Sequence, residues 1–388
     1  MTDASRIDPQ TSRFLDSIRG ISAILVMLSH VVQMYILPHM ANSGFFDGLW
    51  EILASYSVMA FFVISGFVIT ISILENIERN GGKFKPWEFL ESRLVRLYPA
   101  LLFAMLLTIG VYALIHATHF PASDNFYLPG DLFVFREKAV LDWKSILVST
   151  FFLQGIFVES TGPSMNGALW SLSFEFWFYI LAMFFTLWIV NKKQFWGGFF
   201  TVAILVAVLY LDRNSFFTFL STWLAGSAWA IIYRKRRAGE DILRPYLWPL
   251  IGGLLAAIIV LVNANGLWAL IHPYRATPSL IVQTMICWLA MLMTAQIAHW
   301  LEKGTFTYFH ADRLAPFSYT LYLIHFPLLA LAFSFLHPFL HTVSWGYGAL
   351  VGLVLGAVVL FISSLLARVV ENKTMFRKLV AMLISQQK

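Results

Sequence analysis

The sequence contains little charge and almost no cysteine. Only 12% of its 388 residues are charged, about half the share that is usual in soluble domains, whereas 59% are hydrophobic. The one cysteine, Cys287, lies within an apolar run, so the sequence predicts neither a disulfide framework nor a cysteine-based metal site. This composition predicts an integral membrane protein.

Motifs of several common enzyme classes are also missing. The sequence has no Walker-type phosphate loop, no Gly-x-Gly-x-x-Gly, no His-Glu-x-x-His and no Gly-x-Ser-x-Gly. These absences exclude phosphate-loop NTPases, zinc proteases of that type and serine hydrolases of the nucleophile-elbow type. The net charge of +6 does not indicate nucleic-acid binding, because the basic residues flank hydrophobic segments, which is a signal of membrane topology.

Long apolar runs predict an all-α, polytopic membrane protein. A helix needs about 20 apolar residues to cross the hydrocarbon core. Ten runs come close to this length: 18–37, 52–74, 98–117, 168–190, 195–211, 216–233, 246–263, 279–300, 316–337 and 346–368. The first is longer than the apolar part of a signal peptide, so we expect it to be retained. We predict one membrane domain over 1–388, with a polar arm at 1–13 and a cytoplasmic tail at 372–388.

The basic residues predict the orientation, because cytoplasmic loops are enriched in Lys and Arg. With ten spans and both termini cytoplasmic, five of the 27 basic residues lie outside: Arg136, Lys138, Lys144, Arg213 and Arg275. The 13-residue run 145–157 is short for a span, and its crossing would move the basic cluster 234–237 to the outside. We therefore expect an outer loop, 118–167, that contains this run as a non-spanning segment.

Three ionisable side chains lie within predicted spans: His30, Glu175 and His325. Such residues are rare in membranes and are functional candidates. His30 follows Arg19 by eleven residues, about 16 Å along a helix and on nearly the same face. Counting from the span ends places His30 and Glu175 at similar depths, about 18 and 20 Å above the inner face. We predict a pair in which His30 is the base and Glu175 orients it.

Other roles remain open for these residues. The predicted pair can be a structural interhelical hydrogen bond, which contributes about 0.6 kcal/mol on average in membranes. His325, in "SYTLYLIHF", can belong to a hydrogen-bonded cluster of Ser, Tyr and His. Metal ligation by His30, His325 and Glu175 is a weaker alternative, and we predict no metal.

A second constellation is "ESRLVRLYPALL". Arg93 and Arg96 are three residues apart, so they share one helical face, and two guanidinium groups there suit a polyphosphate. We expect Tyr98 and Pro99 to open this span, because proline is tolerated in a first helical turn. The alternative is that both arginines anchor the helix at lipid headgroups.

Five blocks of sequence, in order, resemble the membrane acyltransferase 3 family of O-acyltransferases. They are "FLDSIRGISAILVMLSH", "FFVISGFVIT", "SRLVRLYPAL", "GALWSLSFEFWFYIL" and "SYTLYLIHFPLL". The resemblance covers nearly the whole chain and implies transfer of an acyl group from cytoplasmic acyl-CoA, with acetyl-CoA as the expected donor, to a hydroxyl. The implied acceptor is a sugar, a glycolipid or a cell-envelope glycan. We expect a multi-pass protein in the lipid bilayer of the bacterial inner membrane, with no nucleic-acid partner.

The resemblance also implies roles for individual residues. The expected catalytic residues are His30 and Glu175. The expected donor-binding residues are Arg19, Arg93 and Arg96, since the first matches the basic partner of the family's essential histidine and the others match its paired arginines.

Possible substrate contacts follow from two later blocks. They are Trp170, Ser171, Tyr322 and His325. After Glu175 this chain has Phe and Trp where the family often has a second acidic residue and Gln, and near its end it reads Glu-Asn-Lys where the family usually has Glu-Lys-Pro.

Two other classes of protein fit part of the pattern. A proton-coupled secondary transporter would use His30 and Glu175 as a relay. Such transporters carry repeat-related, broken spans, and the sequence contains no convincing pair of these. A non-catalytic flippase or assembly factor for an envelope polymer is the third class. For an acyltransferase, direct transfer and an acyl-histidine intermediate both remain open.

Overall fold

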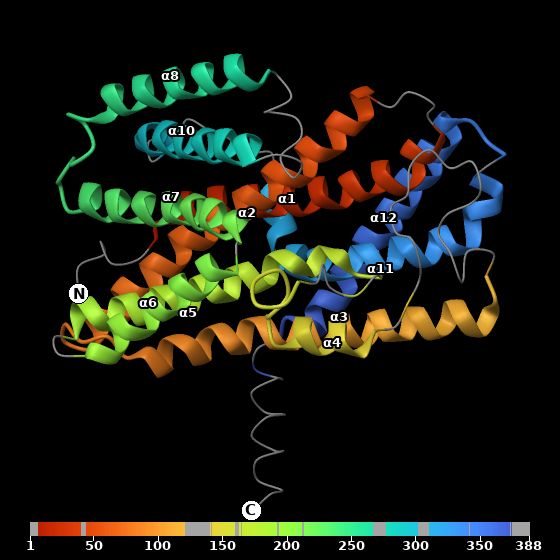
Figure 1. Ribbon diagram of the computed structural model, residues 1–388, viewed down its shortest axis with the longest axis horizontal. Coiled ribbons are helices and arrows are strands. Elements are labelled where there is room, and N and C mark those ends of the chain that lie inside the picture. The colour runs from red at the N-terminus through yellow and green to blue at the C-terminus, as the bar shows by residue number, and fades with distance from the viewer. Residues whose placement is uncertain are drawn as a thin grey trace, which may run out of the picture. The chain divides into compact units, whose positions relative to one another are not determined.

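The computed structural model describes residues 7–39, 44–120, 140, 142–159, 163, 165–191, 194–211, 213–266, 277–301, 310–340, 342–372 and 374. Within these residues the regular structure is all helical, as predicted, and contains no strand (Figure 1). The helices are α1 (Pro9–Tyr35), η2 (Leu37–His39), α2 (Gly44–Arg79), α3 (Pro86–Thr118), α4 (Trp143–Thr150), η3 (Gly167–Leu169), α5 (Trp170–Val190), α6 (Phe195–Tyr210), α7 (Asn214–Arg237), α8 (Leu247–Asn265), α10 (Thr277–Leu301), η4 (Ala311–Leu314), α11 (Ala315–Leu340) and α12 (Trp345–Val370).

Eight of the helices in the described residues are long and apolar enough to cross a membrane. Two further apolar helices are shorter, Phe195–Tyr210 and Leu280–Thr294. Each of the ten predicted runs coincides with one of these helices, and the chain is a multi-pass membrane protein. The number of ten spans and the cytoplasmic position of both termini stay predictions.

The apolar run 145–157 forms a short helix followed by a turn. Helix α4 has eight residues and ends at Thr150, which gives about 12 Å of helix against a core of about 30 Å. In the turn, Phe152 and Ile156 are buried. This run does not form a spanning helix, as predicted. Much of the rest of the predicted outer loop, 121–139, lies outside the described residues.

Helices α1, α2 and α3 each begin at least eight residues before the apolar runs that predict them. Helix α1 begins at Pro9, because the Asp8 carboxylate accepts a hydrogen bond from the backbone N–H of Thr11 at 2.9 Å and caps the helix. Helix α3 begins at Pro86, so Pro99 lies inside it and does not open the span. The prediction for Pro99 was wrong because the first turns of this helix are polar, and hydropathy does not register them.

Contacts divide the chain into two compact units, which are described separately. The first unit comprises Met1–Ser22, Ser55–Leu90 and Phe174–Leu314. In this unit α10 packs against both α7 and α8, and the three helices lie side by side (Figure 1). The prediction of a single membrane domain over the whole chain stays a prediction.

Within the first unit, α2 and α7 approach each other at backbone distance. A Cβ atom added to Gly66 would lie 1.9 Å from the carbonyl oxygen of Trp223, and one added to Gly226 would lie 1.8 Å from that of Val63. No side chain fits in either position, so this crossing requires glycine on both helices.

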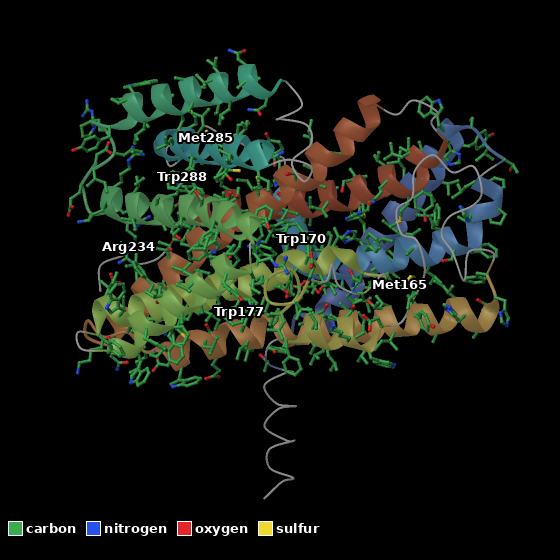
Figure 2. The ribbon with its side chains drawn as sticks, in the orientation of Figure 1. Met165, Trp170, Trp177, Arg234, Met285 and Trp288 are labelled. Carbon is green, nitrogen blue, oxygen red and sulfur yellow. The ribbon has the colours of Figure 1, made fainter. Side chains whose placement is uncertain are left out.

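Four consecutive basic residues end α7, where Figure 2 labels Arg234, and each meets an acidic side chain of the first unit. The pairs are Arg234 with Glu78, Lys235 with Glu240 at 2.7 Å, Arg236 with Asp241 at 3.2 Å, and Arg237 with Asp8 at 3.7 Å. Ion pairs of this kind contribute little stability. They do show that the basic cluster 234–237, which predicts a cytoplasmic loop, has acidic partners within its own unit.

The second unit comprises Ala23–Ala54, Glu91–Ser173 and Ala315–Lys388. In this unit α11 and α12 pack against each other. The candidate histidines both belong to this unit, since His30 of α1 lies within Ala23–Ala54 and His325 of α11 lies within Ala315–Lys388.

Glycines on α12 allow close approach to α1 within the second unit. A Cβ atom at Gly348 would lie 2.2 Å from the carbonyl oxygen of Tyr35, and one at Gly352 would lie 2.6 Å from Cγ1 of Val31. The hydroxyl of Tyr35 also donates a hydrogen bond to the carbonyl oxygen of Leu329 at 2.7 Å. Helix α1, which carries His30, is therefore held by both α11 and α12.

Candidate active site

His30 lies on α1 and its ring stacks against His325 of α11. The ring centroids are 5.2 Å apart and the planes differ by 29°. The rings of His30 and Phe326 form a T-shaped pair with centroids 4.9 Å apart, and Nδ1 of His30 lies 2.8 Å from Oε1 of Gln33, one turn later. When this oxygen accepts the Nδ1 hydrogen, the neutral ring carries its lone pair on Nε2. The structure thus joins two residues that the sequence identified separately.

The two histidines differ in burial. His325 is 0% exposed, whereas His30 is half-buried. Nδ1 of His325 lies 3.0 Å from the carbonyl oxygen of Leu321. Because a carbonyl only accepts, Nδ1 carries the hydrogen and the tautomer of His325 is fixed. His30 is therefore the member of the pair that a reactant can reach.

Hydrogen bonds join α11 to the start of α5. The Tyr322 hydroxyl donates to the carbonyl oxygen of Ala168 at 3.0 Å and accepts from the Ser171 hydroxyl at 2.5 Å. The rings of Tyr322 and His325 lie 6.0 Å apart. Trp170 is the first residue of α5 (Figure 2). It is half-buried. The predicted substrate contacts Ser171 and Tyr322 thus bond to each other, and the substrate contacts themselves stay predictions.

Glu175 lies on α5 in the first unit and accepts a hydrogen bond from the hydroxyl of Tyr179, one turn later. That hydroxyl accepts from Ser65 at 3.3 Å, and Ser65 accepts from Nε1 of Trp223 at 3.3 Å. An indole N–H only donates, so the chain of hydrogen bonds runs in one direction and ends on the carboxylate. This chain orients Glu175. Its predicted pairing with His30 stays a prediction.

The predicted donor-binding arginines lie on two helices. Arg19 lies on α1, eleven residues before His30, and forms an ion pair with Asp16. Arg93 and Arg96 are half-buried on α3, three residues apart in one continuous helix, and so lie on one face. Donor binding by these arginines stays a prediction.

The sequence also left open a metal held by His30, His325 and Glu175. Among the described residues, no group of three His, Cys, Asp or Glu side chains is placed to hold a metal ion. Stacked imidazoles turn their faces toward each other, whereas ligation needs their nitrogen lone pairs to converge on one point. The contact of His30 with His325 is therefore not a ligation geometry.

Comparison with known families decides the class of protein. The acyltransferase domain family known as acyltransferase 3 matches residues 12–368, nearly the whole chain. The chain belongs to this acyltransferase family. No curated protein and no solved structure matches it. As a member of acyltransferase 3 with multiple apolar helices, it is an integral membrane acyltransferase.

The glutamate of the triplet at which this acyltransferase 3 chain departs from the family pattern has a structural role. Glu371, in the Glu-Asn-Lys triplet, follows the end of α12. Its Oε1 accepts hydrogen bonds from the backbone N–H of Thr320 at 3.0 Å and from the Thr320 hydroxyl at 2.7 Å. Without the proline, this carboxylate still ties the end of α12 to the first turns of α11.

Sequence reasoning missed three polar residues around the candidate site of this acyltransferase 3 protein: Gln33, Tyr179 and Asn166. Gln33 and Tyr179 each lie one turn after a predicted catalytic residue, and this spacing was a usable signal. Asn166 lies in a turn before η3 and bonds to α11, 157 residues away. No local pattern registers such a contact.

Proposed function

We propose that this membrane acyltransferase transfers an acyl group, acetyl above all, from cytoplasmic acyl-CoA to a hydroxyl of a sugar or cell-envelope glycan in the bacterial inner membrane. The observation that carries the proposal is His30, half-buried, hydrogen-bonded at Nδ1 and stacked on buried His325. Imidazole is suited to remove a proton from a hydroxyl near neutral pH. Membership of the acyltransferase family supports the reaction class.

In the proposed mechanism, His30 accepts the proton of the acceptor hydroxyl through Nε2. The hydroxyl oxygen attacks the thioester carbonyl, a C–O bond forms, and the tetrahedral oxyanion collapses as the C–S bond breaks. The leaving thiolate then takes the proton back from the His30 imidazolium. Glu175 would stabilise that imidazolium and hold its orientation. In the covalent alternative, Nε2 attacks the thioester carbonyl first, the C–S bond breaks and the coenzyme A thiolate leaves. The acceptor oxygen then takes the acyl group from His30 as the N–C bond breaks, and the thiolate takes the hydroxyl proton.

For the donor, we propose that Arg93 and Arg96, with Arg19, bind the phosphates of coenzyme A. Two guanidinium groups on one face of α3 support this role, because planar guanidinium groups bind phosphate in a bidentate manner. Arg96→Gln should raise the KM for acetyl-CoA several-fold with a smaller change in kcat. An unchanged KM would assign the arginines to lipid headgroups.

The deciding experiment replaces His30. Cells that carry His30→Ala should lose the acetyl-sized mass from their envelope glycans, and the transfer rate in membranes should fall at least about 100-fold, since a general base contributes this much. His116→Ala is the matched control, because Nδ1 of His116 lies 3.1 Å from a carbonyl oxygen of its own helix, near the helix end. That variant should acylate normally.

The proposal fails if His30→Ala accumulates normally and acylates at the wild-type rate. Loss of ion-coupled uptake in the same variant would favour the transporter. Rapid-quench trapping with labelled acetyl-CoA alone separates the two chemical routes, since only the covalent route produces an acyl-histidine before the acceptor is added.

A further inference from the structure

Helix α11 carries a proline two residues after His325. Pro327 lies inside the helix, and proline has no backbone N–H. The carbonyl oxygen of Leu323, four residues earlier, therefore loses its usual partner within the helix. In a membrane protein an unpaired backbone carbonyl is strongly unfavourable, so another donor is needed.

That donor is Asn166, which is fully buried. Its Nδ2 donates to the carbonyl oxygen of Leu323 at 2.9 Å and to the hydroxyl oxygen of Thr108 at 3.3 Å. Thr108 donates its own hydrogen to the carbonyl oxygen of Ala104 at 2.7 Å, so its oxygen acts as an acceptor here. The Leu323 carbonyl oxygen can only accept a hydrogen bond. The side-chain atom of Asn166 that faces it is therefore the amide nitrogen.

Asn166 makes this contact instead of a local one. It occupies the N-cap position of η3, where an Asn side chain commonly accepts a hydrogen bond from the backbone of the next turn. Its side chain makes no such bond. The amide bonds to residues of α3 and α11 instead, so its side chain does not cap the start of η3.

The Leu323 carbonyl lies close to the histidine pair. His325, two residues later, is held by Leu321 through Nδ1 and stacks on His30 at 5.2 Å. Beside it, Tyr322 is held by Ala168. Asn166 and Ala168, just before and within η3, therefore hold the adjacent residues Leu323 and Tyr322 of α11, within one helical turn of His325. All these residues belong to the second unit.

We propose that Asn166 is a positioning residue for the imidazole pair. By donating to the carbonyl that Pro327 leaves without a partner in the helix, it holds the turn of α11 from which His325 lies against His30. No atom of Asn166 is assigned to a reactant, and the inference rests on the proposed function of His30 as the base.

The first test replaces Asn166 by a side chain of similar branching that cannot donate. With labelled acetyl-CoA and membranes that contain the native acceptor, Asn166→Leu should lower kcat between about 10- and 100-fold, since small misplacements of a catalytic group have effects of this size. The KM for acetyl-CoA should change less than about twofold, because donor binding is not affected.

Asn76→Leu is the matched control. Asn76 is also buried, and its amide bonds to the backbone N–H and carbonyl of Lys85 at 2.9 and 3.3 Å in the first unit. Both variants should lower Tm, but only Asn166→Leu should lower kcat per folded protein. Equal kcat losses in the two variants, or a kcat within twofold of wild type for Asn166→Leu, would overturn the proposal.

A double-mutant cycle tests the mechanism directly. Pro327→Ala returns an N–H to α11 that can bond to the carbonyl of Leu323, so the kcat penalty of Asn166→Leu should shrink at least about fivefold in that background. An equal penalty in both backgrounds contradicts the proposal. If Pro327→Ala is itself inactive, the comparison with Asn76→Leu decides. A fully active His30→Ala would instead refute the proposed function, whatever the result at Asn166.

Discussion

Glu175 shows how a single carboxylate is prepared inside an apolar helix. Glu175 is half-buried, and a polar group that is partly removed from water needs hydrogen bonds. Here the donor is the hydroxyl of Tyr179, which itself accepts a hydrogen bond from Ser65, and Ser65 accepts one from Trp223. All four residues lie in the first unit. This series of hydrogen bonds begins at the indole N–H of Trp223, which can donate a hydrogen bond but cannot accept one. None of the hydrogen bonds in the series can therefore reverse its direction. The carboxylate therefore has one preferred orientation.

Tyr179→Phe tests this orientation, because it keeps the ring and removes only the hydroxyl. Loss of one hydrogen bond to a charged group costs about 1.5–3 kcal/mol, and even the lower figure corresponds to about a tenfold slower transfer if Glu175 supports the base. Initial rates with labelled acetyl-CoA measure the effect. Glu175→Gln should be slower still. A wild-type rate in Tyr179→Phe together with an impaired Glu175→Gln would show that the hydroxyl does not serve the carboxylate.

Asp8 acts at the opposite end of α1 from the site, as a cap and as a partner of α7. Its Oδ2 accepts a hydrogen bond from Tyr233 at 2.7 Å, and Arg237 lies 3.7 Å away. Burial alone would raise the pKa of Asp8, but the hydrogen bonds from Thr11, Tyr233 and Gln10 together outweigh it and lower the pKa below the usual 3.8.

This shift predicts a pH-dependent stability. A carboxyl whose pKa is lower in the folded protein stabilises the fold above its unfolded pKa, and the contribution is lost as pH falls through the lower folded pKa. Asp8→Asn keeps a capping side chain but loses the charge, so Tm in detergent should fall at pH 6, by an amount equivalent to about 1 kcal/mol. The difference from wild type should shrink below pH 3.8.

Asp142 is the control for this measurement. It caps the eight-residue helix α4 through Lys144 and Ser145, and its pKa is lowered mainly by the Ser145 hydroxyl, but it is exposed to solvent. Asp142→Asn should leave Tm unchanged, because water screens exposed charge. A Tm difference for Asp8→Asn that is the same at pH 6 and at pH 3 would exclude a role for the Asp8 charge.

At the scale of elements, backbone-to-backbone packing is the most specific feature of the first unit. Gly66 and Gly226 each face a carbonyl oxygen of the opposite helix. Small residues at such positions let helices associate by van der Waals contact in lipid, where no hydrophobic driving force acts between them. The close contact between α2 and α7 therefore requires glycine at both positions, because only a hydrogen atom fits where other residues carry a side chain.

Gly66→Ala should separate these helices. The added methyl group would meet the Trp223 carbonyl, which is backbone and cannot rotate away, so we expect a loss on the order of 3 kcal/mol and a clear fall in Tm. Gly252→Ala in α8 is the matched control, since an added Cβ there has nothing within 4 Å. The crossing would be disproved as a stabilising contact if both alanine variants unfolded at the same temperature.

The sequence predicted the helices well and their ends poorly. Apolar runs locate helices, because lipid requires each spanning segment to satisfy its own backbone. The starts at Pro9 and Pro86 are set by polar first turns that precede the apolar runs, which is also why Pro99 was misplaced. A window of hydropathy averages over such turns and so cannot find them.

The candidate site was predicted as residues but not as a geometry. His30 and His325 stood out because lipid disfavours ionisable groups, whereas their stacking depends on how α1 packs against α11. Asn166 gave no signal, because its partner is a backbone carbonyl released by Pro327, and only the three-dimensional structure joins these two residues. The chemistry of a side chain follows from the residue itself, whereas a contact between distant residues is known only from the three-dimensional structure.

At the scale of the whole molecule, topology is the property on which the proposed reaction depends. Acyl-CoA is cytoplasmic in the proposed function, so the α3 arginines must face inside. The distribution of basic residues predicts this orientation, and it places α4 outside. Two exposed positions test the prediction: Lys144 next to the start of α4, and Glu240 just after α7.

Cys287 makes this test simple, because it is the one cysteine of the chain. In a Cys287→Ala background, Lys144→Cys should react with a membrane-impermeant maleimide on intact cells, because the predicted outer loop faces the reagent. Glu240→Cys should react only after the membrane is permeabilised, and its loss of an exposed ion pair with Lys235 should cost little. Reaction of both cysteines on intact cells would mean that an even number of spans, and not the three predicted, lies between residues 144 and 240. If Lys144→Cys did not react on intact cells, the α3 arginines would lie outside, and the donor site would need a new location.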